Sequence, residues 1–391
     1  MEKVALVSYH FWYNYGTCYQ SYALWKVLDK MGVQAEYLNF GWEYPISDDV
    51  YLLHFWKKNV RINPLRLFYV NLRKYIHLLK RKQRILPQIR LDYTLLTNNR
   101  KFDKFRKQFI KETPLLKENC LVNIENSYSL FLVGSDQVWR PCYFKSQWNA
   151  GIENAFLSFT RDWKIKRIAY AASFGVNDWE FSDQETQLVA EAGKLFSVIS
   201  VREDSGIKLL KEKLNLDSIQ VLDPTLLLSR DDYVKLIEKA DIGKSSGNLL
   251  TYILNPSSKK TTFINEVAKA KGLIPFSVNN SNVKQTAPIE QRIMPSIEKW
   301  LQGFNDAKLV VTDSFHACVF SIIFNKPFIV LGNHERGNAR FDSLLKLFSL
   351  QNNLVTDLEN FDLDNILSSC VGNKKIDDLR NKSIQFLKQF I

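Results

Sequence analysis

Residues 3–40 read KVALVSYHFWYNYGTCYQSYALWKVLDKMGVQAEYLNF, and this stretch decides the fold class. Lys3 to Ser8 is a short apolar run typical of a strand, and Tyr15 to Met31 carries apolar residues at the spacing of a helix. Val33 to Phe40 alternates apolar and polar residues, which predicts a second strand. The opening therefore predicts a βαβ unit, from which parallel sheets are built.

The same rhythm continues along the chain and restarts after Ser229. Apolar strands joined by helices indicate parallel sheets covered by helices on both faces. We therefore expect an α/β protein with two Rossmann-like domains facing a cleft, residues 1–229 and 230–357, and a helical segment, 358–391, that packs back on the first domain. The further predicted strands are SLFLVGSD (129–136), KRIAYAASFG (166–175), SVISVRE (197–203), SIQVLDPTLLL (218–228), NLLTYIL (248–254), LIPFSVN (273–279), KLVVTDSF (308–315), KPFIVLG (326–332) and NNLVTD (352–357).

Composition agrees with a globular protein of two or three domains. The chain has 391 residues, of which 46% are hydrophobic and 24% charged, so disordered and low-complexity classes are excluded. The most apolar stretch, 317–332, is interrupted by polar residues and is shorter than the roughly 20 residues that cross a bilayer. The N-terminal apolar run lacks a cleavage site, and the five cysteines are widely spaced. We therefore expect a cytoplasmic protein with reduced thiols.

The net charge of +12 is concentrated in one segment. Residues 48–110 break the α/β rhythm, and 57–107 contain sixteen Lys or Arg against two acids, so the rest of the chain carries −2. Apolar residues recur there at helical spacing, which predicts a basic helical insertion in the first domain. This helix suits an anionic membrane surface, the inner face of the cell membrane. A charged outer face over a core stripe explains the pattern equally well.

Several common chemistries lack their motifs. The sequence contains no GxxxxGK[ST], no GxGxxG after the first strand, no HExxH and no GxSxG. The five histidines never pair at ligand spacing, so we expect no metal and no bound cofactor. What remains are loops at strand ends, where open α/β sheets bind their ligands.

Two of these loops precede or follow strands of the first half. Asn14, Gly16 and Thr17 open the first helix, where backbone N–H groups favour a phosphate or carboxylate, or where Asn14 simply caps the helix. Asp136 and Gln137 follow an apolar strand, and Asp136 either orients a sugar hydroxyl or caps the next helix.

Three further loops complete the set. Ser173 begins a small-residue strand end that either lets a ligand approach the backbone or forms an ordinary turn. Arg202 places a guanidinium at the mouth of a strand, for an anion or for a structural ion pair with Glu203. Ser314 and His316 start a helix directly after a strand, and a lone histidine there is either catalytic or structural.

Together these motifs resemble the polysaccharide pyruvyl transferase family. The resemblance runs in the family's order from about residue 8 to 350. It implies a fold like that of the two-domain GT-B glycosyltransferases, phosphoenolpyruvate as donor, and a sugar of a surface-polysaccharide precursor, lipid-linked or nucleotide-linked, as acceptor. The implied product is a pyruvate ketal. The motifs are NYGTCYQSYAL, VGSDQVW, IAYAASFG, SVREDSG, VLDPTLLL, TDSFHACVFSIIFNKPF and NARFDSLL.

The resemblance also suggests roles for single residues. The family's motif arginine corresponds to Arg202 and its motif histidine to His316, and both should face the donor and approach one another. Some members carry Arg-Leu-His where this chain has Ser314-Phe315-His316. A cation is therefore missing near the donor, and Arg340 is our first candidate to replace it, with Arg336 second.

The chemistry of phosphoenolpyruvate sets the remaining requirements. Protonation of its methylene carbon creates an oxocarbenium-like centre that a sugar hydroxyl attacks, so a general acid is needed, and His316 suits that role. Arg202 would stabilise the departing phosphate. Asp136 is the candidate base, and Asp136, Gln137 and Ser173 are the candidates for binding the acceptor. The donor-binding candidates are Arg202, Arg340, Arg336, Ser314, Asn14, Gly16 and Thr17.

Two other functions compete with this interpretation. A nucleotide-sugar glycosyltransferase shares the two-domain fold, and fold alone does not choose between donors. A nucleic-acid binder built on 57–107 is disfavoured because no RRM, KH or zinc-finger signature accompanies the charge. We therefore expect no nucleic-acid partner.

Overall fold

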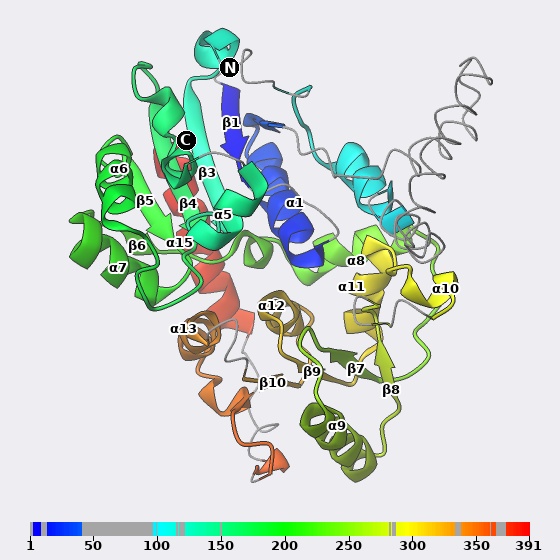
Figure 1. The fold of residues 1–391 in the computed structure, drawn as a ribbon. Coiled ribbons are helices and arrows are strands. Elements are labelled where there is room, and N and C mark those ends of the chain that lie inside the picture. The colour runs from blue at the N-terminus through cyan, green and yellow to red at the C-terminus, as the bar shows by residue number, and fades with distance from the viewer. Residues whose placement is uncertain are drawn as a thin grey trace, which may run out of the picture.

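The computed structural model contains two parallel sheets, one in each half of the chain (Figure 1). The predicted α/β class with two Rossmann-like domains is confirmed. The last strand of the first sheet ends at Gln220 and the second sheet starts at Leu249, so the predicted boundary at 229 falls between them. The structure describes residues 3–8, 14–40, 97–98, 100–114, 116, 122–148, 151–280, 283, 287–332, 338–359, 361–364 and 373–391.

The first sheet has six strands in the order β2-β1-β3-β4-β5-β6. Strand order reverses between β1 and β3, and ligands bind at such switch points, beyond the carboxyl ends of the strands. The strands are β1 (Lys3–Val7), β2 (Gln34–Tyr37), β3 (Leu130–Asp136), β4 (Lys166–Ala172), β5 (Val198–Val201) and β6 (Ile219–Gln220). The helices of this half are α1 (Tyr15–Lys30), η2 (Val122–Ser127), α5 (Pro141–Trp148), η3 (Ile152–Phe156), η4 (Ser158–Thr160), α6 (Asp183–Gly193), α7 (Asp204–Leu214) and η5 (Pro224–Leu227).

The second sheet has the order β11-β10-β9-β7-β8, with its switch point between β7 and β9. Its strands are β7 (Leu249–Tyr252), β8 (Pro275–Ser277), β9 (Leu309–Thr312), β10 (Phe328–Leu331) and β11 (Leu354–Val355). The helices of this half are α8 (Arg230–Glu238), α9 (Ser258–Lys271), α10 (Ile289–Arg292), α11 (Ile297–Asp306), α12 (Phe315–Ile323), α13 (Ala339–Phe348) and η6 (Gln351–Asn353).

The C-terminal helix α15 (Asn373–Phe390) returns to the first domain (Figure 1). The Ser383 hydroxyl accepts a hydrogen bond from the backbone N–H of Leu222 at 3.1 Å, and Arg380 donates to the carbonyl of Leu226 at 2.9 Å. The Phe386 ring lies 6.2 Å from that of Tyr170 on β4. The last helix thus covers the segment that connects the two sheets.

One predicted strand is wrong over most of its length. Of residues 218–228 only Ile219–Gln220 is a strand, and Pro224–Leu227 forms the short helix η5. Pro224 has no N–H for a ladder, and the Asp223 side chain accepts a hydrogen bond from the Thr225 N–H at 3.0 Å, which starts the helical turn. The capping hydrogen bond of Asp223 therefore decides the local structure, and the apolar run forms a helical turn instead of a strand.

Aromatic side chains join the two domains around α1. The rings of Tyr15 and Tyr19 each stack on Trp300 of α11 at 5.4 Å. The Tyr15 hydroxyl donates to the carbonyl of Pro295 at 2.7 Å, and that of Tyr19 to Ile297 at 2.5 Å. These buried rings hold the start of α1 against the second domain, which matters for the site described below.

Residues 100–109 are the described end of the predicted basic insertion, and they form a helix. Phe102 and Phe105 are buried, and the Phe102 ring lies 5.1 Å from that of Tyr15. At this end of the insertion the apolar face packs on the protein. Residues 48–96 of the predicted insertion lie outside the described residues, so the choice between a membrane-binding helix and a core stripe stays open there.

Candidate active site

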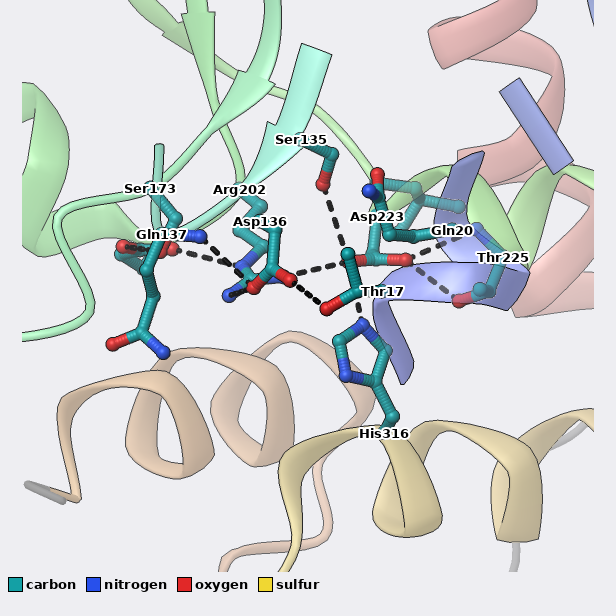
Figure 2. Close-up of polar contacts among 12 residues, drawn as sticks. Thr17, Gln20, Ser135, Asp136, Gln137, Ser173, Arg202, Asp223, Thr225 and His316 are labelled. Carbon is teal, nitrogen blue, oxygen red and sulfur yellow. Dashed lines mark hydrogen bonds and ion pairs between the residues drawn. The ribbon is translucent and has the colours of Figure 1, made fainter. Parts of the chain in front are cut away.

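The carboxyl ends of the two sheets bring together the strongest candidates from the sequence (Figure 2). Asp136 ends β3 and Arg202 directly follows β5, both in the first domain. His316 is the second residue of α12, which follows β9 at the switch point of the second sheet. Figure 2 shows the imidazole rising from α12 toward the first domain. The site is therefore shared between the domains.

Arg202 is the centre of a buried ion network, with 1% of its side chain exposed. Its Nη1 donates to Asp223 Oδ2 at 2.9 Å, while Glu203 Oε2 is 3.4 Å from Nε and Asp136 Oδ1 is 3.7 Å from Nη2. Burial opposes the charge, but the three carboxylates outweigh it and raise the pKa of Arg202. Its Nε and Nη2 form no hydrogen bond, but each faces one of these carboxylates as an ion pair.

Asp223 connects Arg202 with His316, and the sequence analysis did not nominate it. Its Oδ2 accepts from Arg202 and lies 3.7 Å from His316 Nε2. Burial favours the neutral acid, yet His316, Arg202 and the Thr225 hydroxyl together lower the pKa of Asp223. Asp223 is thus a carboxylate at neutral pH. Arg202 and His316 approach one another, as expected, because both lie next to the same oxygen, Asp223 Oδ2.

Gly16 lets the His316 ring approach α1. A Cβ built on Gly16 would lie 2.1 Å from His316 Nδ1, far inside van der Waals contact. No side chain larger than hydrogen fits there while the imidazole keeps its place. The glycine predicted to bind the donor therefore has a clear structural task in positioning the histidine.

We expect Gly16→Ala to lower turnover by roughly 10²-fold, the usual effect of misplacing a reacting group by about 1 Å. The added methyl must displace the imidazole or separate α1 from α12. Gly206→Ala in α7 is the control, because its Cβ would meet Val201 at 3.2 Å and needs only a small adjustment. Steady-state rates of both variants measure the loss of turnover, and thermal unfolding establishes that both are folded. Wild-type turnover in Gly16→Ala would show that the observed imidazole position is dispensable.

Arg340 is a buried cation without a carboxylate partner. It is 8% exposed, its Nε has no hydrogen-bond partner, and it makes no ion pair with the described residues. Burial and the charge of Arg202 lower the pKa of Arg340 to about 10, so it stays charged at neutral pH. Both guanidiniums lie against the Phe315 ring, at 4.5 Å from its centroid for Arg202 and 5.7 Å for Arg340. Glu203 and Asp136 act on Arg340 only from a distance, and a buried guanidinium without a direct carboxylate contact favours an anionic ligand.

The remaining donor candidates lie at helix N-termini. Asn14 caps α1 by accepting from the Thr17 N–H at 3.3 Å, so the cap alternative is right for its side chain. Ser314 is the N-cap of α12, but its hydroxyl does not cap the helix. The first-turn N–H groups of α12 have no intrahelical partner and favour an anion. The second-choice cation, Arg336, lies outside the described residues.

Asp136 is held on both carboxylate oxygens. The Thr17 hydroxyl donates to Oδ2 at 2.6 Å, and the Gln137 N–H donates to Oδ1 at 2.9 Å. Although burial opposes ionisation, Arg202, His316 and these donors lower the pKa of Asp136. A carboxylate with a lowered pKa is a weak base, so the geometry favours an anchoring role for Asp136 over the predicted role as base.

The two other acceptor candidates, Ser173 and Gln137, are both buried. Ser173 is completely buried and donates to Glu203 Oε1 at 2.5 Å, so it does not reach an acceptor in this conformation. The register of β4 shifts between Ala169 and Ala172, and this irregularity precedes Ser173. Gln137 extends from the end of β3 toward the second domain in Figure 2.

Two residues of the site were missed by the sequence analysis: Asp223 and Phe315. Each lies inside a quoted motif, VLDPTLLL or TDSFHACVF. The ion pair of Glu203 with Arg202, one of the two alternatives for that loop, is present at 3.4 Å. Asp223 follows an apolar strand and directly precedes a proline, which is typical of a turn residue. This local pattern gives no indication that the carboxylate pairs with His316. Only the fold places it beside a histidine 93 residues later in the chain.

Metal and membrane features were also sought in the described part of the chain. There, no three His, Cys, Asp or Glu side chains are grouped closely enough to hold a metal ion. Among the same residues, none of the helices combines the length and the apolar character needed to span a bilayer.

Comparison with known proteins identifies the family. The family model for polysaccharide pyruvyl transferase matches residues 14–335. The chain belongs to this family. That match includes every pyruvyl transferase motif quoted above up to His316, so the protein is an enzyme of the transferase class. No curated protein matches the chain at a significant level.

Solved structures similar to this pyruvyl transferase family member are distant in sequence. S. aureus MnaA in a co-structure with UDP is 11% identical with a TM-score of 0.47, covering 100% of this chain and 90% of that one. Anabaena HepE with UDP and glucose is 11% identical with a TM-score of 0.45, covering 100% and 95%. UDP-GlcNAc 2-epimerase from Neisseria meningitidis is 13% identical with a TM-score of 0.45, covering 100% of both chains.

Proposed function

We propose that the enzyme transfers the enolpyruvyl group of phosphoenolpyruvate to a sugar of a surface-polysaccharide precursor, forms a pyruvate ketal and releases phosphate. The single observation that carries this proposal is Arg340, a buried guanidinium without a carboxylate partner among the described residues, next to the network of Arg202. A small anion bound at Arg340 would supply the counter-charge that no described carboxylate provides by direct contact.

The donor fits this arrangement because it carries a phosphate and a carboxylate. In the proposed complex one anionic group lies against Arg340, near the first turn of α12. Arg202, His316 and Arg340 are each less than a tenth exposed, so the site must open to admit the donor and can close over it. Closure keeps water away from the oxocarbenium-like carbon, with which water would otherwise react in place of the sugar hydroxyl.

The proposed reaction uses His316 as the general acid. Its proton adds to the methylene carbon of the donor, which becomes the methyl group, and one sugar hydroxyl oxygen bonds to the central carbon. The carbon–oxygen bond to phosphate then breaks, and Arg202 and Arg340 stabilise the leaving group. A second sugar hydroxyl closes the ketal. Of the two hydroxyl protons released, one restores the acid and one leaves with the phosphate, and no oxidant or bound cofactor is required.

The acceptor is proposed to be carried on a lipid diphosphate or on a nucleotide. Gln137 and Asp136, at the end of β3, are its proposed contacts. Attachment of the enzyme to the inner face of the cell membrane through residues 57–107 stays a proposal, because most of that segment lies outside the described residues.

The test is release of inorganic phosphate from phosphoenolpyruvate, with lipid-linked oligosaccharide in one arm and nucleotide-linked sugar in the other. We expect acceptor-dependent release in one arm, and a rise in the thermal unfolding midpoint with phosphoenolpyruvate alone. A nucleoside diphosphate that stabilises the protein, with no response to phosphoenolpyruvate, would instead identify a nucleotide-sugar glycosyltransferase.

A further inference from the structure

We propose that Asp223 is the positioning residue of His316: it orients the imidazole by facing its Nε2 from the first domain. This inference rests on the proposed function, in which His316 is the general acid. Asp223 touches neither the donor nor the acceptor in this proposal and acts only through the histidine.

Asp223 is rigidly held, as a positioning carboxylate must be. Its Oδ1 accepts from both the N–H and the hydroxyl of Thr225, at 3.0 and 2.6 Å. Its Oδ2 accepts from Arg202 at 2.9 Å and from the Ser135 hydroxyl at 3.4 Å. Four donors from three segments of the first domain therefore fix the carboxylate, which is 3% exposed.

The imidazole shows which nitrogen faces this carboxylate. His316 Nε2 is buried, lies 3.7 Å from Asp223 Oδ2 and has no hydrogen-bond partner at this distance. In Figure 2 one ring nitrogen points at Asp223 and the other points away from it. The second nitrogen, Nδ1, packs against Gly16 of α1, where an added Cβ would lie 2.1 Å from it. The imidazole is thus fixed between a carboxylate at Nε2 and the backbone of α1 at Nδ1.

The charged groups around His316 are consistent with this role. His316 contributes to the lowered pKa values of two carboxylates, Asp223 and Asp136. Arg202 contacts Asp223, and Arg340 lies 5.7 Å from the Phe315 ring, whose centroid is 5.3 Å from that of His316. Asp223 is the nearest of these groups and faces a ring nitrogen directly.

The pair of Asp223 and His316 is divided between the two domains, and this links proton transfer to domain closure. Asp223 belongs to the first domain and His316 to the second, so the 3.7 Å gap shortens to a hydrogen bond only if the domains approach further. The acid is then fully assembled only in the closed enzyme. This order prevents protonation of the donor while water still has access to the site.

The decisive variant is Asp223→Asn, which keeps an oxygen for Thr225 but loses the charge. We expect kcat to fall by roughly 10- to 10³-fold. The donor KM should change much less than kcat, because Asp223 acts through the acid and does not touch the donor. Thermal unfolding establishes that the variant is folded.

Glu203→Gln is the matched control. Glu203 is also a buried carboxylate next to Arg202, at 3.4 Å, but it is not in contact with His316. If Asp223 acts through His316, the control keeps most of kcat and changes mainly the donor KM. In a His316→Gln background, Asp223→Asn should cost less than threefold more. An equal fall of kcat in both carboxylate variants, or full additivity with His316→Gln, would overturn the proposal.

A measurement on the wild-type protein separates this inference from the proposed function. Nitrogen NMR of histidine-labelled enzyme, with His316→Gln for assignment, should find the neutral His316 tautomer protonated on Nε2. Protonation on Nδ1 overturns the inference whatever the reaction is. Absence of any phosphate release from phosphoenolpyruvate would overturn the proposed function, and the tautomer would still test the pairing with Asp223.

Discussion

His316→Gln is expected to lower turnover by roughly 10²–10⁴-fold, the usual contribution of a positioned general acid. Glutamine has a similar reach and hydrogen-bonding capacity but no proton to transfer near neutral pH. Because the imidazole forms no hydrogen bond within 3.5 Å at Nε2, its replacement removes little folding energy. The measurement is the initial rate of acceptor-dependent phosphate release, together with thermal unfolding with and without phosphoenolpyruvate.

Ser321→Ala is the control for this variant. Ser321 lies in the same helix, and its hydroxyl only donates to the carbonyl of Ala317 at 2.8 Å. We expect near wild-type turnover from the control and normal stabilisation by phosphoenolpyruvate in His316→Gln. If His316→Gln retains more than a tenth of wild-type turnover, another group is the acid.

Arg340→Met is expected to abolish donor binding and at the same time stabilise the ligand-free enzyme. Methionine fills a similar volume, and it removes a buried charge that has no carboxylate partner among the described residues and is close to Arg202. The gain in unfolding free energy should be on the order of 1 kcal/mol, because the desolvation cost disappears. The loss in kcat/KM for the donor should be roughly 10²–10³-fold. Thermal unfolding without ligand and a titration with phosphoenolpyruvate measure the two effects.

Arg167→Met is the control for Arg340→Met, because the opposite effect on stability is expected. Arg167 is also buried, but its guanidinium donates to the Thr160 hydroxyl at 2.8 Å and to the carbonyls of Ile165 and Trp163 at 3.0 Å each. Its loss leaves buried acceptors unpaired and should destabilise the protein. If Arg340→Met destabilises the protein as Arg167→Met does, or still binds phosphoenolpyruvate normally, Arg340 is a structural residue and the donor lies elsewhere.

Local patterns in the sequence were sufficient for most of the elements. The apolar run at Lys3–Val7 and the helical spacing from Tyr15 predict β1 and α1 to within one residue at either end. Both depend on period and capping over a few residues, and burial on both faces of a parallel strand leaves a continuous apolar run. The segment 218–228 shows the limit of this reasoning, because an Asp-Pro-Thr turn inside an apolar run forms a short helix.

By itself, the sequence determined the class of the fold, the family and the motif residues Arg202 and His316, because each depends on a short stretch of chain. Tertiary structure alone decided that Asp223 faces His316, that Gly16 makes room for the ring, and that Arg340 is buried without a carboxylate among the described residues. These relations join residues from different strands and from both domains. Charge, burial and contact across a domain interface depend on how the two sheets face each other, and no local pattern encodes that.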